Sequence, residues 1–124
     1  MLKEIGTYLQ SQGIGTLGTD LFLGLMSDQP DNCIALFEYA GSPPDLHWNG
    51  EYPGLQVRVR NKSYRAGREK IQQIYELLHG LHNQIFSGTR YLLIKARGSP
   101  EVLKRDANNR IELFVNFEII KERD

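Results

Sequence analysis

The chain has 124 residues, of which 40% are hydrophobic and 24% charged, so it has the size and composition of one globular domain and not of a disordered or fibrous chain. Its fifteen basic residues balance fifteen acidic ones, and its apolar runs are far shorter than the roughly 20 residues of a membrane span. With a single cysteine, Cys33, and no apolar core of a secretory signal at the start, we expect one cytoplasmic domain, residues 1–124, with no membrane partner.

The first part of the chain predicts one helix followed by two strands. Apolar residues recur at spacings of three and four over residues 2–9, which indicates an amphipathic helix that ends at Gly13. Residues 19–26 and 33–39 are predicted as strands with apolar side chains on both faces, so both should be covered on two sides. The turn-forming residues 27–32 between them predict a short, hairpin-like connection.

The middle of the chain predicts a long loop, a strand and a second helix. Residues 41–53 hold three of the five prolines and indicate an exposed loop with Trp48 in it. The next strand alternates, with three side chains facing inward (Leu55, Val57, Val59) and three facing water (Gln56, Arg58, Arg60). Ser63 is expected to cap the second helix, whose apolar face includes Gly67 and which ends near Gly80.

Two further strands are predicted at the end of the chain, over residues 91–97 and 111–120, joined by residues 98–110. Because short links between successive strands predominate, neighbouring strands should run antiparallel. The sequence therefore predicts an α+β domain, with a mostly antiparallel sheet of about five strands and two helices packed on one face.

Several patterns look like catalytic or ligand sites, and their context argues against each. Residues 13–18 match the spacing of a dinucleotide-binding loop, but the helix comes before the glycines and the strand after, which is the reverse of the required order. Glu76, His79 and His82 have a metal-like spacing, yet a metal centre needs three or four converging ligands. Cys33 lies in an apolar strand, where a thiol is inert. We expect no enzymatic activity, no cofactor and no metal site.

The charge is unevenly distributed along this neutral chain. Residues 1–57 carry one basic and seven acidic residues, a net charge of −6, whereas residues 58–70 carry six basic residues and one acidic, a net charge of +5. Such polarity in a neutral chain can steer association with an acidic partner. The candidate contact residues of this basic stretch are Arg58, Arg60, Lys62, Arg65 and Arg68, and Trp48 is a second candidate in its loop.

Each of these candidates has an alternative interpretation. The basic stretch could be a solvated edge whose charges face the chain's own acids. It could also make the chain a small nucleic-acid-binding module, although only Tyr64 lies close enough for base stacking and the pI of about 6.8 is low for such a domain. Trp48 could instead fold back over its own sheet edge.

Three stretches form a pattern that covers most of the chain. They are residues 13–22 (GIGTLGTDLF) running on to 35–41 (ALFEYAG), residues 53–60 (PGLQVRVR) followed by Ser63, Tyr64, Ala66 and 77–80 (LLHG), and residues 110–117 (RIELFVNF). This pattern resembles the phage tail terminator proteins, also called tail-to-head joining proteins, and among them the bacteriophage minor capsid protein group.

The resemblance implies a structural role in the virion. Tail terminators are similar small α/β proteins that form hexameric rings on the head-proximal end of a finished tail tube, stop its growth and offer a docking surface to the head. The implied partners are other copies of the chain, the tail tube protein, the head completion or connector protein, and DNA that passes through the channel without sequence-specific binding. Assembly would take place in the host cytoplasm.

Overall fold

The computed structural model describes residues 1–123 as two helices and seven strands. In chain order they are α1 (Leu2–Ser11), β1 (Leu21–Leu23), β2 (Cys33–Ser42), β3 (Gly50–Asn61), α2 (Tyr64–Leu78), β4 (His82–Phe86), β5 (Thr89–Ala96), β6 (Glu101–Arg105) and β7 (Ile111–Glu122). All strands belong to one sheet of order β1-β2-β3-β7-β5-β4, and β6 pairs with β7. Neither described helix is long and apolar enough to cross a membrane.

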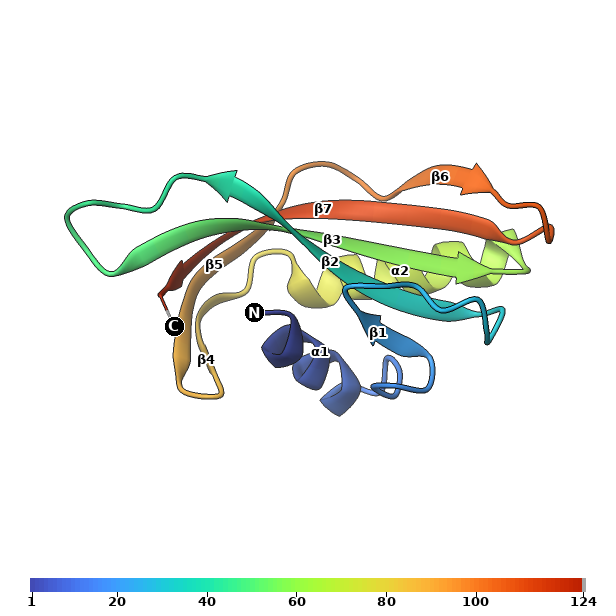
Figure 1. Cartoon of the computed structure of the whole chain (residues 1–124), viewed down its shortest axis with the longest axis horizontal. Coiled ribbons are helices and arrows are strands. Elements are labelled where there is room, and N and C mark those ends of the chain that lie inside the picture. Colours follow the sequence, from blue (N-terminus) through green and yellow to red (C-terminus); the bar gives the residue numbers. More distant parts are fainter. Residues whose placement is uncertain (124) are drawn as a thin grey trace.

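The sheet is strongly twisted, and both helices lie on the same side of it (Figure 1). Helix α2 packs on β3, β7 and β5, whereas α1 packs on β1, β2 and β4. One continuous core fills the space between the helices and the sheet. Its fully buried members include Ile5 and Leu9 from α1, Ile71, Ile74 and Leu78 from α2, Leu55 and Val57 from β3, and Leu113, Val115 and Phe117 from β7.

Both helices follow the sequence prediction closely. The Ser63 side chain accepts a hydrogen bond from the Ala66 amide at 3.2 Å and so caps α2. Helix α1 ends at Ser11, and Gly13 adopts a φ of 77°, the left-handed conformation expected after a helix. The α+β class is confirmed.

A mostly antiparallel sheet of about five strands was expected, whereas the observed sheet is larger, with seven strands, and mixed. Strand β1 is only three residues long and runs parallel to β2, with Leu21 opposite Ile34. Because a hairpin joins antiparallel strands, the prediction of a hairpin-like connection over 27–32 is wrong. Strands β4 and β6 were not expected, because their side chains are largely exposed and show no alternation of apolar and polar residues. Exposed edge strands leave little hydrophobic signal in a sequence.

The expected loop over residues 41–53 is instead the end of a long hairpin. Strand β2 continues to Ser42, which pairs with Tyr52 across an irregularity in the β2–β3 ladder, and β3 already begins at Gly50. Only residues 43–49 connect the strands, and this tip projects beyond the rest of the molecule (Figure 1). Next to the tip, β3 is held to β7 by the buried Lys121, whose ammonium lies 2.6 Å from a carboxylate oxygen of Glu51.

Gly67 gives a test of the packing between α2 and the sheet. A Cβ atom on this residue would lie 3.0 Å from Leu113 Cδ1 and 3.1 Å from Asn61 Cβ. We predict that Gly67→Val lowers the free energy of unfolding by about 1–3 kcal/mol through overpacking, measured by urea denaturation. Ala66→Val, at the neighbouring exposed position of the same helix, should change it by about 0.5 kcal/mol. Equal effects of the two variants would contradict this account of the helix–sheet contact.

Candidate assembly interface

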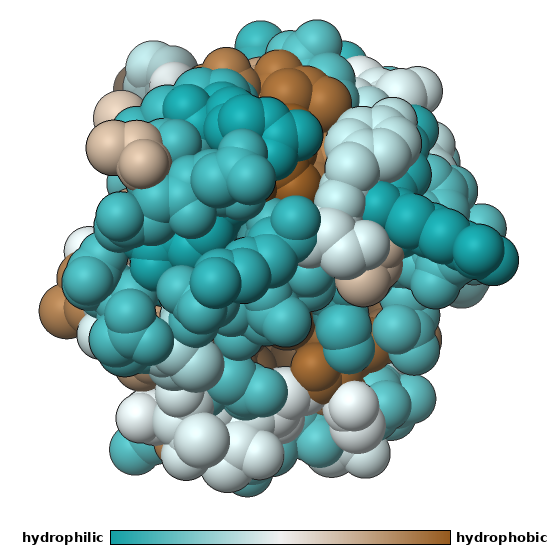
Figure 2. All heavy atoms as spheres, turned by 90° about the vertical axis from the view of Figure 1, so that its right-hand side faces the viewer, coloured by the Kyte–Doolittle hydropathy of each residue, from teal (hydrophilic) through white to brown (hydrophobic). Residues whose placement is uncertain are grey.

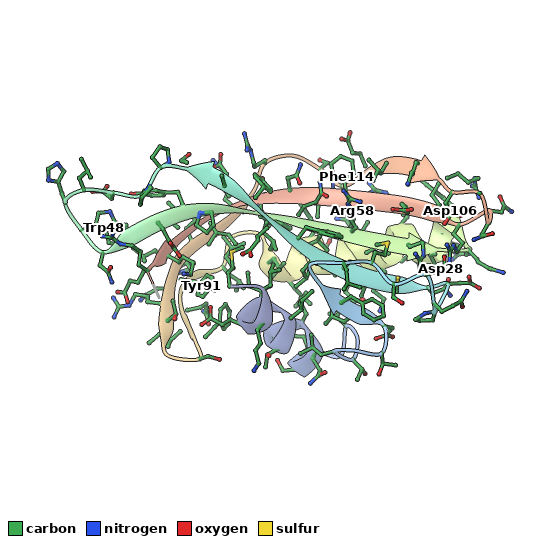
Figure 3. All side chains as sticks on the ribbon, viewed as in Figure 1. Asp28, Trp48, Arg58, Tyr91, Asp106 and Phe114 are labelled. Atoms are coloured by element: carbon green, nitrogen blue, oxygen red, sulfur yellow. The ribbon has the colours of Figure 1, made fainter. Side chains whose placement is uncertain are left out.

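Arg58 lies on the face of the sheet that neither helix covers. Its guanidinium sits 4.8 Å from the centre of the Phe37 ring, and its Nε donates a hydrogen bond to the Gln56 side chain at 2.7 Å. Phe114 of β7 is directly opposite Arg58 in the ladder and is only partly buried (Figure 3). This open face therefore presents a cation between two aromatic rings, a combination suited to contact with another protein.

Arg60 is on the same face but is not in water. Its side chain is 4% exposed, and its guanidinium donates to the backbone carbonyls of Ser27, Pro30 and Asp31 at 2.6–3.0 Å. The expectation of a water-facing Arg60 is wrong because the segment between β1 and β2 folds over this end of the sheet. Arg60 holds that segment in place, and its charge is not available to a neighbour.

Arg110 is a second buried arginine, and it was not among the predicted functional residues. Its side chain is 4% exposed and pairs with three carboxylates, those of Asp106 at 2.8 Å, Asp28 at 2.9 Å and Asp31 at 3.3 Å. Asp28 and Asp106 come from separate turns that meet at one end of the molecule (Figure 3). Hydrogen bonding to Asp28 is the main cause that raises the Arg110 pKa. The spacing of four residues from Asp106 was the available signal.

The other basic candidates are spread over different surfaces. The Lys62 ammonium lies 3.4 Å from Asp31, and the 89% exposed Arg65 side chain pairs with Glu69 at 3.2 Å on α2. Arg68, also on α2, donates to the backbone carbonyl of Pro100 at 3.1 Å. The helix lies on the opposite side of the sheet from Arg58, so the fold does not join these cations into one continuous basic patch.

The end of the molecule that carries Asp28 and Asp106 has a mainly hydrophilic surface, with small separate hydrophobic areas (Figure 2). An interface there would be polar, as the rims of protein–protein interfaces are. Nothing in this arrangement specifically favours the nucleic-acid-binding alternative, which needs bases and stacking aromatics along one groove.

Trp48 folds back onto its own hairpin. Its indole covers Gly50, where an added Cβ would collide with the ring, and its Nε1 donates to the Tyr52 hydroxyl at 3.2 Å. The two rings meet edge to face at 6.4 Å. The large hydrophobic side chain that the tip exposes is instead Leu46, which is 93% exposed. The sequence pattern predicted Trp48 as the contact residue of this loop and gave no signal for Leu46.

The tip is held in one shape by a set of polar contacts. Asp45 accepts from the His47 amide at 2.8 Å and from the Tyr52 hydroxyl at 3.1 Å. These bonds, the backbone one first, lower the pKa of Asp45, so it is ionised at neutral pH. Arg123, which directly follows β7, donates to the Asn49 side chain and to the Trp48 carbonyl. These contacts hold the tip in one shape, and the exposed Leu46 side chain projects from it.

A shallow apolar hollow lies beside β1, in the other half of the molecule from the tip. It is lined by Lys3, Leu17, Gly18, Leu21, Phe22, Leu23 and Leu25 and has a volume of about 450 Å³. Leu25 is 57% exposed at its edge. The hollow includes the end of the glycine-containing segment 13–18, which follows α1 and precedes β1, the order of helix and strand that was predicted.

The histidines near the end of α2 have structural partners. The Nδ1 atom of His79 accepts from the Ala96 amide at 3.0 Å, and its ring stacks on Tyr75 with centroids 5.4 Å apart. The Nδ1 atom of His82 lies 3.2 Å from the Gly80 carbonyl oxygen. Across residues 1–123, no three His, Cys, Asp or Glu side chains are arranged so that they could hold a metal ion.

Comparisons with known proteins agree with the sequence resemblance. Residues 8–123 match the model of the family described as bacteriophage tail terminator protein. Among solved structures, a chain from "Virion of native gene transfer agent (GTA) particle" superimposes with a TM-score of 0.71 at 12% identity, covering 97% of this chain and 94% of that one. That likeness shows a shared fold. A search of curated proteins gives no significant match.

The buried Arg110 cluster gives a prediction for stability. Removing the guanidinium leaves the carboxylates of Asp28 and Asp106 without a cation, while Asp31 keeps Lys62, and breaking the ion pairs of a buried arginine is costly. We predict that Arg110→Met lowers the melting temperature by about 10 °C or more. Arg105→Met, the same change at an exposed position, should lower it by less than about 3 °C. Similar losses in both variants would show that Arg110 does not hold the two turns together.

The same cluster predicts an acid dependence. The carboxylate of Asp106 accepts from the Arg110 amide, the Arg110 guanidinium and the Asn108 amide, and the first of these is the main cause that lowers its pKa. Its stabilising effect is complete above the usual pKa of about 3.9 and is lost as the pH falls through the lowered value. In thermal melts from pH 5 to pH 2, Asp106→Asn should therefore show a smaller acid-induced loss of stability than the wild type.

Proposed function

Since the chain belongs to the bacteriophage tail terminator family, we propose that it assembles as a ring on the head-proximal end of a tail tube, ends tube growth and joins tail to head. The observation that carries this proposal is the family match over residues 8–123, which includes nearly all of the domain. A fold shared with a chain of a virion particle supports the same structural, non-enzymatic role.

The distribution of charge and of surfaces suits such a ring. A closed ring uses a heterologous interface, in which one patch of each subunit meets a different patch of the next. We propose that Arg58, Lys62, Arg65 and Arg68 contact acidic surface of neighbouring subunits. Arg60 is set apart from this group because its guanidinium is used within the chain.

The proposal includes the partners of the ring. It is a homo-oligomer, hexameric in the families it resembles, with the tail tube protein on one side and the head completion or connector protein on the other. DNA passes through its channel without sequence-specific contacts. The complete ring belongs to the virion, at the head-proximal end of the tail, after assembly in the host cytoplasm.

Tube growth gives the direct test of this function. Purified chain is added to the polymerising tail tube protein of the same phage, and tube lengths are followed by negative-stain microscopy. We expect tubes to stop growing and to carry a ring at one end. Unchanged tube growth, with a monomer that binds DNA in a strongly salt-dependent way, would favour the nucleic-acid-binding module instead.

Charge reversal tests the proposed basic contacts. The double variant Lys62→Glu, Arg65→Glu should weaken ring formation about tenfold or more in sedimentation, because like charges then face each other across the interface. Lys95→Glu, at an exposed position of β5, serves as the control for a general change of charge. If the double variant and the control assemble as the wild type does, these two side chains lie outside the subunit interface.

A further inference from the structure

The surface of this molecule carries a protruding hydrophobic side chain and, far from it, an apolar hollow. One is Leu46, 93% exposed at the tip of the β2–β3 hairpin, and the other is the hollow beside β1. Figure 1 places the tip at the left end of the longest axis, whereas β1 lies in the right half of the molecule. The tip therefore cannot reach the hollow of its own chain.

The tip has the properties of a preformed contact element. The packing of Trp48 on Gly50, the bonds to Asp45 and the bracing by Arg123 hold the connection in one shape. A leucine presented on such a support loses little conformational freedom on binding, so more of its burial energy appears as affinity. An exposed leucine on a flexible loop would lack this advantage.

The hollow has complementary properties. Five of its seven lining residues are leucine or phenylalanine, and its volume of about 450 Å³ gives room for a branched aliphatic side chain. Lys3 stands in its lining, is exposed and has no ion pair among residues 1–123. Asp45, ionised and next to Leu46, supplies a charge of the opposite sign. Lys3 is also the single basic residue of segment 1–57.

We propose that the hairpin tip of one subunit docks in the β1 hollow of the next copy of the chain, with Leu46 in the hollow and Asp45 facing Lys3. A protrusion and a pocket at different places on the same molecule make a heterologous contact, which forms a ring when the rotation closes. The inference rests on the proposed ring, and it assigns one contact within it.

Disulfide trapping tests the contact itself. Leu46→Cys and Leu25→Cys are made as separate proteins, mixed, and exposed to a mild oxidant. The native Cys33 stays, because it is buried and its burial raises the thiol pKa. The Leu46→Cys and Leu25→Cys proteins should cross-link about tenfold faster than Leu46→Cys with Ile85→Cys. Ile85, at the β4–β5 hairpin, is a matched control because it is 63% exposed and Leu25 is 57% exposed. Equal rates for the two pairs would overturn the proposal.

A second variant separates this contact from the proposed function. Leu46→Asp should abolish ring formation at concentrations where the wild type sediments as a ring, and the matched Ile85→Asp should not. If Leu46→Asp still forms rings that stop tube growth, the contact is wrong and the function stands. If its rings form but no longer bind the tube, the tip docks on the tube and the contact is also wrong. If the 46–25 pair cross-links selectively while the wild type never stops tube growth, the contact stands and the function fails.

Discussion

The pairing of β3 with β7 is the constraint on which the other elements depend. Both strands have twelve residues, and they run antiparallel from Gly50 opposite Glu122 to Asn61 opposite Ile111. One face of this pair buries alternate apolar side chains under α2, and the other face carries Arg58 between Phe37 and Phe114. Because side chains alternate along a strand, one ladder provides both the core and an open surface for a partner.

At one end of the molecule, two charged side chains are buried and stabilise the fold. Arg60 and Arg110 are buried, and together they bond to the carbonyls and carboxylates of residues 27–31 and to Asp106. A buried guanidinium with several acceptors fixes the geometry of a turn that has few apolar residues of its own. Of these two arginines, Arg60 belongs to the basic stretch 58–70, and the other candidate cations of that stretch lie on different faces of the molecule.

At the other end, polar contacts fix the shape of the protruding hairpin. The Trp48 indole and the Asp45 carboxylate both bond to the Tyr52 hydroxyl, and Arg123 bonds to the Asn49 side chain. Leu46 stays exposed. The indole packs on its own hairpin, where it covers Gly50. The subunit contact that we propose rests on this rigid arm and on an apolar hollow that no segment of residues 1–123 fills.

Local patterns were sufficient for the elements whose signal lies in neighbouring residues. The periodicity of α2, the Ser63 cap and the alternation of Leu55 and Val57 all follow from helix and strand geometry alone, and the motifs along the chain were enough for the family. The parallel β1, the edge strands β4 and β6, the burial of Arg60 and the exposure of Leu46 did not follow from them. Each depends on which distant segment covers a residue, and such long-range contacts leave no periodic pattern in the sequence.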